Sequence, residues 1–286
     1  MDTGNFIHEL LEKTSRRYEE IADEAQMREY AIEVGKELLT RSVYAMQQDT
    51  ASGLVFSEKL LEEGAQVAVA AYRQIKQSDF KVEATEKTVS AEWISGKVDR
   101  IDGTEKFVRV IDFKTGTIDD SAASYYTGRK MQMQLYMSNV QGERTPAGVF
   151  YFPAAISYTD DEEGKFRMKG VMNGDPEALL CGDKNLTENQ KSEFFPAALK
   201  NGGNVKRVMD EKTFRDFIDY STHVARQGCK ELKEGYIQPT PYEKSCEYCK
   251  YGGMCGVDKD ISKPRAESSI DPATIAGIAK KQREGE

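Results

Sequence analysis

The 286-residue sequence lacks the features that mark several large classes of protein. No stretch approaches the roughly 18 apolar residues of a membrane-spanning helix, and the N-terminus lacks the basic-then-apolar pattern of a signal peptide. The pattern G-x-x-x-x-G-K-[ST] is absent, which excludes a motor of the P-loop kind. The chain has no internal repeat. We therefore expect a cytoplasmic protein without a membrane partner.

Cysteine is scarce and unevenly placed. The chain has five cysteines, an odd number, and Cys246, Cys249 and Cys255 crowd into ten residues. A secreted protein of this length more commonly carries spread, even-numbered pairs. We therefore expect reduced thiols, with the clustered ones acting as metal ligands.

The charge balance excludes a surface that is basic all over. The net charge is −8, and charged residues make up 31% of the chain against 39% hydrophobic ones. A uniformly basic coat for nucleic acid is therefore absent, although a local basic groove is compatible with this total. The apolar fraction still suffices for a core, with much solvated surface around it.

The texture of the sequence divides the chain into five parts that we expect to form one domain. Helical periodicity gives way near residue 79 to alternating, β-branched and aromatic runs. The expected parts are a helical part (1–78), a strand-rich core (79–157), a polar insertion (158–209), a long helix with the cysteine segment (210–258) and a flexible tail (259–286). Within them, Ser57 is expected to cap the third helix, and one helix is expected over 121–140.

Two short acidic motifs predict a site for a divalent cation. The stretch "GKVDRID" contains Asp99, "VIDFKTG" contains Asp112, and the turn at Gly103 between them is short enough for a β-hairpin. Folding the chain there brings both carboxylates to one end of neighbouring strands. Because Mg²⁺ prefers oxygen ligands and accepts a few carboxylates together with waters and substrate phosphate, this end of the hairpin is a candidate metal site.

Lys114 follows Asp112 by two residues, so the two side chains share one face of the strand. Its ammonium group can there polarise an attacking water and offset charge that builds on a phosphate. Phe113 would point into the core, while its backbone carbonyl can still reach the cation. The alternative is a solvated strand end with an Asp–Lys pair worth well under about 1 kcal/mol. The buried run before Asp112 favours the site, because bare charges there are costly.

Gln132 and Tyr136 are four residues apart in the next predicted helix and therefore share a face. Their amide and hydroxyl can brace the lysine, a water at the cation, or a phosphate. The alternative is that Met131, Leu135 and Tyr136 are core residues and Gln132 lies at its boundary. The sequence pattern alone favours neither.

The joint order of these motifs resembles a known family. A histidine on an early helix (His8 in "GNFIHELLEK"), then G-x-V-D-R-I-D, D-F-K-T-G and Q-x-x-x-Y are similar to the RecB-type branch of the PD-(D/E)xK nucleases. Within that branch, the chain most resembles the nuclease domains of AddB-type helicase–nuclease subunits. The resemblance covers most of the chain, more weakly at 158–204. It implies an α/β, restriction-endonuclease-like core, in which helices flank a mixed central β-sheet, with a helical N-terminal part and a C-terminal cysteine-cluster segment.

The resemblance also implies roles for the candidate residues. Mg²⁺ or Mn²⁺ would be held by His8, Asp99, Asp112 and the backbone carbonyl of Phe113. The catalytic lysine would be Lys114, and the branch's extra motif would comprise Gln132 and Tyr136. His223 matches no motif and is expected to be structural.

The implied activity is exonucleolytic hydrolysis of single-stranded DNA in double-strand-break repair, beside a helicase–nuclease partner subunit of AddA type. One alternative is a stand-alone nuclease of the CRISPR spacer-acquisition type, which shares these motifs. A second is a non-catalytic module for DNA binding or docking, which the intact Asp99, Asp112 and Lys114 disfavour.

The spacing C-x2-C-x5-C of Cys246, Cys249 and Cys255 suits thiolates that hold a metal centre, but three are one short of a closed site. In the nucleases that the chain resembles, such a triplet joins a cysteine upstream of the His-bearing helix to hold a [4Fe–4S] cluster. We therefore expect a domain from a longer protein, with the fourth ligand upstream of Met1 and the cluster absent or incomplete here. Cys181 and Cys229 are weaker substitutes, and zinc is the alternative metal.

Overall fold

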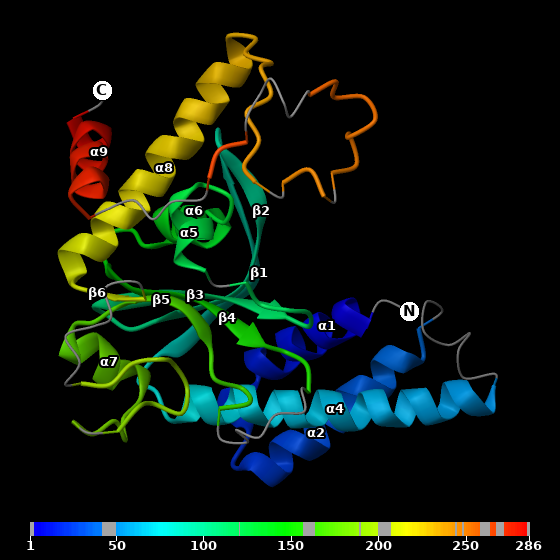
Figure 1. The fold of residues 1–286 in the computed structure, drawn as a ribbon. Coiled ribbons are helices and arrows are strands. Elements are labelled where there is room, and N and C mark those ends of the chain that lie inside the picture. The colour runs from blue at the N-terminus through cyan, green and yellow to red at the C-terminus, as the bar shows by residue number, and fades with distance from the viewer. Residues whose placement is uncertain are drawn as a thin grey trace.

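A computed structural model describes residues 3–41, 50–119, 121–156, 164–188, 190–199, 207–243, 245–247, 249–257, 264–266 and 272–284. These residues form a mixed six-stranded sheet with helices on both faces (Figure 1). The predicted fold class, an α/β core in which helices flank a mixed central sheet, is confirmed. Within the same ranges, no helix is both long enough and apolar enough to cross a membrane.

The strands lie in the sheet in the order in which they occur along the chain. The bounds are β1 (Lys81–Ala91), β2 (Ile94–Gly103), β3 (Phe107–Lys114), β4 (Thr145–Pro153), β5 (Lys169–Asn173) and β6 (Val208–Met209). The β3–β4 and β5–β6 pairs are parallel, and the other pairs are antiparallel. The hairpin predicted at Gly103 is therefore present, as β2 and β3.

The helices form a layer on each face of the sheet (Figure 1). On one face lie α1 (Thr3–Arg16), α2 (Glu24–Leu39) and α4 (Ala51–Lys76), with a 3₁₀ turn at Tyr18–Glu20. On the other lie α5 (Ala122–Tyr126), α6 (Gln132–Val140), α8 (Glu211–Lys233) and α9 (Pro272–Glu284). The short α7 (Pro176–Gly182) follows β5.

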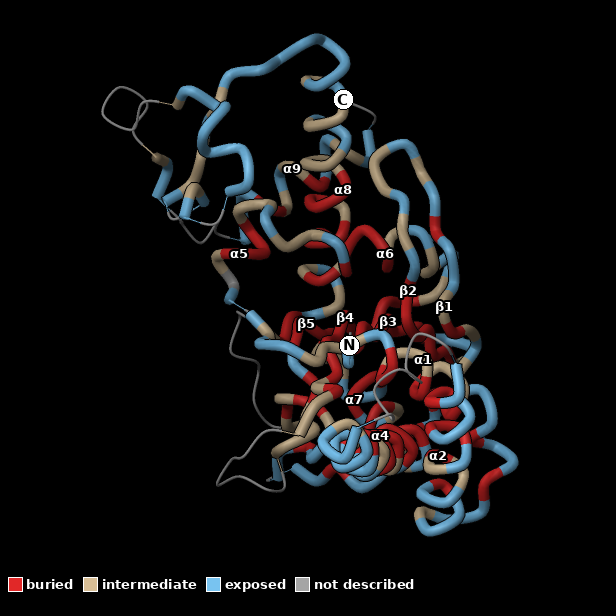
Figure 2. Tube along the Cα trace, turned by 90° about the vertical axis from the view of Figure 1, so that its right-hand side faces the viewer, coloured by how far each residue is buried: buried red, intermediate tan, exposed pale blue. Residues whose placement is uncertain are grey.

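Alternation along β3 and β4 produces a separate apolar core on each face. Ile111 and Phe113 pack with α1, α2 and α4, whereas Val110 and Tyr151 pack with α6 and α8. Figure 2 shows the buried strands between the two layers. Burying a side chain such as Phe113, which is 1% exposed, contributes about 1.5–3 kcal/mol. This period of two also fixes which side chains can meet at the strand ends.

A buried charge cluster joins β2, β3 and α4. Asp102 Oδ2 accepts hydrogen bonds from Arg109 Nε at 2.9 Å and Arg100 Nη2 at 3.0 Å. Arg100 also donates to Gln74, and the Arg109 guanidinium lies 4.3 Å from the centroid of the Phe80 ring. Because Arg109 is buried and lies near Arg100, its pKa falls to about 10. One buried carboxylate therefore compensates two buried cations.

Two of the expected parts differ from the structure. The stretch 158–209, expected as an insertion, supplies β5 and β6 to the sheet and buries Met168 and Phe195 in the core. Its apolar residues are separated by turns, and they become buried through the pairing of β5 with β4 and through packing into the core that α1, α2 and α4 share. The expectation of a flexible tail is wrong for 272–284, which form α9. Ile275 and Ala279 share one face of α9 and are buried, and Arg283 bonds to α8.

Two local helix expectations are also wrong. Ser57 does not cap a helix but lies buried within α4, which begins one residue after Thr50; the Thr50 side chain accepts a hydrogen bond from Gly53 N. The single helix expected over 121–140 is divided into α5 and α6. Ser121 is the N-cap of α5, as the expected start of the helix implies. Gly128 has φ +80° between them, a left-handed conformation that ends a helix.

We predict that Asp102→Asn strongly destabilises the fold. The substitution keeps the size of the side chain but leaves two buried guanidinium groups without a counter-charge. The free energy of unfolding should fall by about 3–5 kcal/mol. Urea denaturation measures the change. The matched control is Glu83→Gln, which removes a half-exposed ion pair with Arg144 and should cost at most about 1 kcal/mol. Equal losses in the two variants would contradict a structural role for the cluster.

Candidate active site

The site forms where β2 separates from β3. Their pairing extends from Gly103↔Val108 to Arg100↔Ile111, although β2 begins at Ile94 and β3 continues to Lys114. At the next position, the Phe113 N–H donates to Asp99 Oδ2 at 2.6 Å in place of a backbone carbonyl. Beyond it, the β1–β2 hairpin leaves the sheet (Figure 1). The Asp99 carboxylate is therefore fixed at the fork between the strands.

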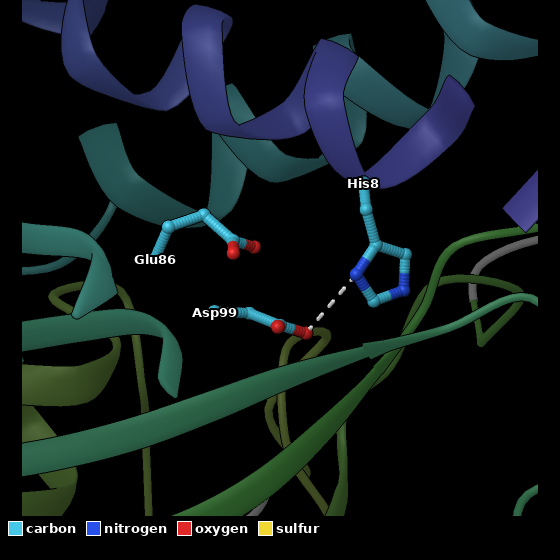
Figure 3. Close-up of side chains that lie close together, drawn as sticks. All are labelled: His8, Glu86 and Asp99. Carbon is cyan, nitrogen blue, oxygen red and sulfur yellow. Dashed lines mark ion pairs between the residues drawn. The ribbon is translucent and has the colours of Figure 1, made fainter. Parts of the chain in front are cut away.

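Three side chains from three different elements converge on this fork. His8 comes from α1, Glu86 from β1 and Asp99 from β2, and Figure 3 shows them directed toward a common space. One ligand atom from each lies within 4.8 Å of the others, and His8 Nδ1 is 3.5 Å from Asp99 Oδ2. The His8 ring also meets the Phe113 ring edge-on, with centroids 5.9 Å apart. Packing thus orients the imidazole toward the carboxylates.

Glu86 is held in an unusual backbone conformation. It has φ +49° and is the only non-glycine residue in the described part of the chain with a positive φ. Such a conformation costs about 1–3 kcal/mol and is concentrated at functional sites. Glu86 lies between the pairs Thr85↔Arg100 and Lys87↔Val98, which places it across from Asp99. Its Oε2 is 3.5 Å from Lys97 Nζ.

Asp112 and Lys114 lie together on the other side of β3 from Phe113. Lys114 Nζ is 2.6 Å from Asp112 Oδ2 and 5.5 Å from the centroid of the Tyr151 ring on β4. Burial, with the charge of Asp99 adding to it, raises the pKa of Asp112 although the hydrogen bond from Lys114 opposes this. Burial and the charges of Asp112 and Asp119 raise the pKa of Tyr151 to about 12. Its hydroxyl therefore remains protonated beside the ion pair.

The acidic surroundings also favour the charged form of His8. Its pKa is raised above 6.5, chiefly by the hydrogen bond with Asp99 and then by the charges of Asp99, Asp112 and Glu86, while burial opposes the shift. Two groups at the fork thus hold protons more tightly than usual, His8 chiefly because it hydrogen-bonds to Asp99 and Asp112 chiefly because it is buried. Protons that compensate crowded carboxylates are those that a bound cation would replace.

The residues present fit a hard divalent cation. His8, Glu86 and Asp99 offer one imidazole nitrogen and carboxylate oxygens, and Asp112 adds a further carboxylate across the fork. Oxygen-rich donor sets of this kind suit Mg²⁺ and Mn²⁺. The predicted face shared by Asp112 and Lys114 is confirmed, as is the burial of Phe113. The approach of the Phe113 carbonyl to a cation stays a prediction.

Gln132 and Tyr136 lie together on α6, as their spacing predicts. Gln132 Nε2 donates to the Tyr136 hydroxyl at 2.8 Å, and Tyr136 is buried whereas Gln132 is exposed. A Cβ at Gly96 would overlap the Tyr136 hydroxyl, so the glycine admits this tyrosine against β2. Leu135 is also buried. The observed contact is compatible with a core role and with a bracing role, and the catalytic role of the pair stays a prediction.

The cysteines lie apart from this fork. Cys249 and Cys255 are exposed and Cys246 is half-buried, in turns that follow α8. Cys181 lies in α7, where its carbonyl accepts a hydrogen bond from Asp79 N, and Cys229 lies in α8 beside Glu92. His223 is a half-buried residue of α8, as expected. The ligands of an iron–sulfur cluster stay a prediction.

Sequence reasoning missed Glu86 and Tyr151. Glu86 could have been found from the two-residue turn Glu92–Trp93, because folding the chain there places Glu86 opposite Asp99. Tyr151 could not, since β3 and β4 are parallel and separated by two helices. No short turn fixes the register of such a pair.

Comparisons with known proteins agree with the geometry. A family model described as the PD-(D/E)XK nuclease superfamily matches residues 1–256. Similar curated proteins, each named as a subunit of an ATP-dependent helicase/deoxyribonuclease, come from Staphylococcus carnosus (27% identity; 85% of this chain, 26% of the relative) and Lachnoclostridium phytofermentans (25%; 99% and 29%). Another of the same name, from Clostridioides difficile, is 28% identical over 58% of this chain and 17% of its own length.

The chain thus spans less than a third of the length of each of these relatives. The matches confirm the resemblance to RecB-type nucleases of the AddB kind that the motifs indicated. With its mixed sheet, the fork at Asp99 and the Asp112–Lys114 pair, the chain belongs to the PD-(D/E)XK nuclease superfamily.

Proposed function

We propose that this chain is the nuclease domain of an AddB-like subunit and hydrolyses phosphodiester bonds of single-stranded DNA with Mg²⁺ or Mn²⁺. The proposal includes exonucleolytic action in double-strand-break repair and a helicase–nuclease partner of AddA type. It is supported by the relatives' name, which includes both a helicase and a deoxyribonuclease. The single observation that carries it is the meeting of the His8, Glu86 and Asp99 ligand atoms beside the Asp112–Lys114 pair.

Each residue of the fork has a distinct task in this proposal. His8, Glu86, Asp99 and Asp112 would hold the divalent cation. When bound, that cation supplies Lewis-acid stabilisation of the phosphoryl group and makes a water more acidic. Asp99, fixed by the Phe113 N–H, needs no reorientation.

Lys114 would act at the reacting phosphate. In the structure its ammonium pairs with Asp112. With Asp112 engaged as a metal ligand, Lys114 would be able to contact a phosphate oxygen or the attacking water. There it would offset negative charge in the transition state. The Tyr151 ring keeps the ammonium at the strand end in either position. The Gln132–Tyr136 pair would support this side of the site from α6.

The cysteine triplet belongs to the proposal as a separate structural centre. Cys246, Cys249 and Cys255 would hold a [4Fe–4S] cluster together with a fourth thiolate. Their support is the spacing of the triplet and the exposure of Cys249 and Cys255 on turns after α8. This centre takes no part in the chemistry at the fork.

We predict that Asp112→Asn abolishes metal-dependent cleavage of single-stranded DNA. Changes to residues that only support metal ligands cost about 10–100-fold, so the loss of a ligand should cost at least about 100-fold. The measurement is degradation of an end-labelled oligonucleotide with Mg²⁺ and with EDTA. The control, Asp79→Asn, removes an exposed carboxylate that pairs with Lys184.

Thermal melting of all three proteins must accompany this assay. A folded wild type that leaves the oligonucleotide intact would point to the non-catalytic module instead. Equal cleavage by wild type and Asp112→Asn would exclude Asp112 from the chemistry.

We predict that Glu86 is a metal ligand, so Glu86→Gln should weaken Mn²⁺ binding at least about tenfold. Isothermal titration calorimetry measures the affinity. Glu86→Gly separates this role from backbone strain, because glycine adopts φ +49° without cost. This variant should lose metal affinity equally while its melting temperature stays unchanged or rises. Wild-type affinity in both variants would show that the carboxylate does not bind the ion.

Metal binding should weaken as the pH falls. A cation binds the neutral imidazole, and the pKa of His8 is raised above 6.5 by Asp99 and the other carboxylates. Below that raised pKa the imidazole is protonated, so Mn²⁺ must displace a proton. Affinity should fall toward a limit of about tenfold per pH unit for one proton. Calorimetry between about pH 8 and about pH 6 tests this, and His8→Gln should flatten the dependence. An unchanged slope in that variant would assign the proton to another group.

A further inference from the structure

A basic groove opens beside Lys114, at the ends of β3 and β4. It encloses about 530 Å³, and its charged lining residues are Lys114, Lys165, Arg167 and Lys169, with no acidic residue among the described ones. The rest of the lining is small or apolar residues of the β3–α5 loop and the β4–β5 segment. Residues 160–163, which are acidic, lie outside the described part of the chain. In a chain of net charge −8, this is a local reversal of sign.

The adjoining hollow on the other face of the sheet lacks this bias. It shares Thr115 and Ala155 with the groove, and its charged lining residues are one lysine, Lys59, and one glutamate, Glu63. The larger hollow near Gly103 is lined by both signs, with acidic residues in excess. Among these hollows, only the one that contains Lys114 has charged lining residues of a single sign in the described part of the chain.

The strand register places the groove on the same face of the sheet as Asp112 and Lys114 of the fork. Asp112 pairs with Tyr151 across β3 and β4, and Tyr151 pairs with Lys169 across β4 and β5. Residues that are directly opposite each other in a sheet project from the same face. Lys169 thus lies on the side of Asp112, Lys114 and Tyr151, two interstrand spacings or about 10 Å away from Asp112.

The groove also lies where an open α/β sheet binds ligands. It is bounded by the carboxyl ends of the parallel strands β3 and β4, the edge at which such sheets form ligand crevices. The Ala154 N–H donates to the Lys114 carbonyl at 2.8 Å, which ties the two strand ends together. Arg167 Nε donates to the Ser192 carbonyl at 3.1 Å, so its charge is held in place rather than extended into solvent.

We infer that this groove binds the phosphodiester backbone of single-stranded DNA next to the phosphate that is cleaved. Lys165, Arg167 and Lys169 would contact neighbouring phosphates of the strand that Lys114 and Asp112 engage. The inference rests on the proposed function, because it takes the fork to be the cleavage site. Phosphate contacts from side chains carry no base preference, so the groove would hold any sequence.

The test compares the variant Lys165→Gln/Arg167→Gln/Lys169→Gln with a matched triple variant. The control neutralises three exposed lysines that do not line the groove, Lys36, Lys76 and Lys230. Fluorescence anisotropy with a labelled oligothymidylate, in an Asp112→Asn background, gives the affinity at several salt concentrations. Cleavage of the same oligonucleotide is measured with Asp112 intact.

Neutralising the groove should weaken binding on the order of 100-fold at about 0.1 M salt, and the slope of log affinity against log salt should fall by about 2. Both values follow from about 0.7 counterions released per phosphate contact on a single strand. The KM for DNA should rise accordingly. Mn²⁺ affinity of the groove variant should match that of the wild type, which shows that the fork remains intact. The control triple should keep the wild-type slope.

The possible outcomes separate the groove from the nuclease proposal. If the groove variant binds like the control while the wild type cleaves, the groove assignment is wrong and the nuclease proposal stands. If binding depends on the groove but the wild type does not cleave, the groove is supported and catalysis is excluded. If the wild type does not bind the single strand even at low salt, the groove assignment falls as well.

Discussion

The site depends on one hydrogen bond, from the Phe113 N–H to the Asp99 carboxylate. It occupies the position where the β2–β3 ladder stops, so it satisfies a buried backbone donor that separation of the strands would otherwise leave unpaired. Because the strands part here, side chains of both sheet faces can meet at one point. His8 reaches Asp99 from the face covered by α1, and Asp112 pairs with Lys114 on the opposite face. A continuous ladder would keep these two groups apart.

The charged residues of the stretch Asp99–Asp102 belong to two different parts of the structure. Asp99 belongs to the fork, whereas Arg100 and Asp102 join Arg109 in the buried cluster near α4. The cluster fixes β2 against β3 next to the point where they part. Carboxylates at the fork are crowded, since Asp99, Asp112 and Glu86 all raise the pKa of His8. Burial raises the pKa of Asp112 as well, and Glu86 adds backbone strain. The buried cluster begins at Arg100, one residue from Asp99, and it stabilises the strands against both the repulsion between the carboxylates and the backbone strain at Glu86.

The features that could be predicted from the sequence are those set by residues close together in the chain. The Gly103 hairpin and the Asp112–Lys114 face follow from a short turn and a period of two, whereas the mixed α/β fold was implied by the resemblance that the joint order of the motifs carries. Glu86 was equally accessible from the turn at Glu92–Trp93. Tyr151 and Lys169 were not, because their places depend on a parallel pairing across two helices and on β5, within a stretch expected to be an insertion. The apolar face of α9 was likewise too short to be recognised before its partner α8 was in place.

The net charge of this molecule argues against a nucleic-acid partner, whereas the charge of the groove argues for one. A total of −8 would repel a polyanion at long range, but exposed charges farther apart than about 8–10 Å are largely screened at physiological salt. Within that range of a strand in the groove lie the lining residues, of which the described charged ones are basic, and the Asp112 carboxylate that pairs with Lys114. Under the proposed function, this contrast would restrict the strand to the one path that ends at Lys114.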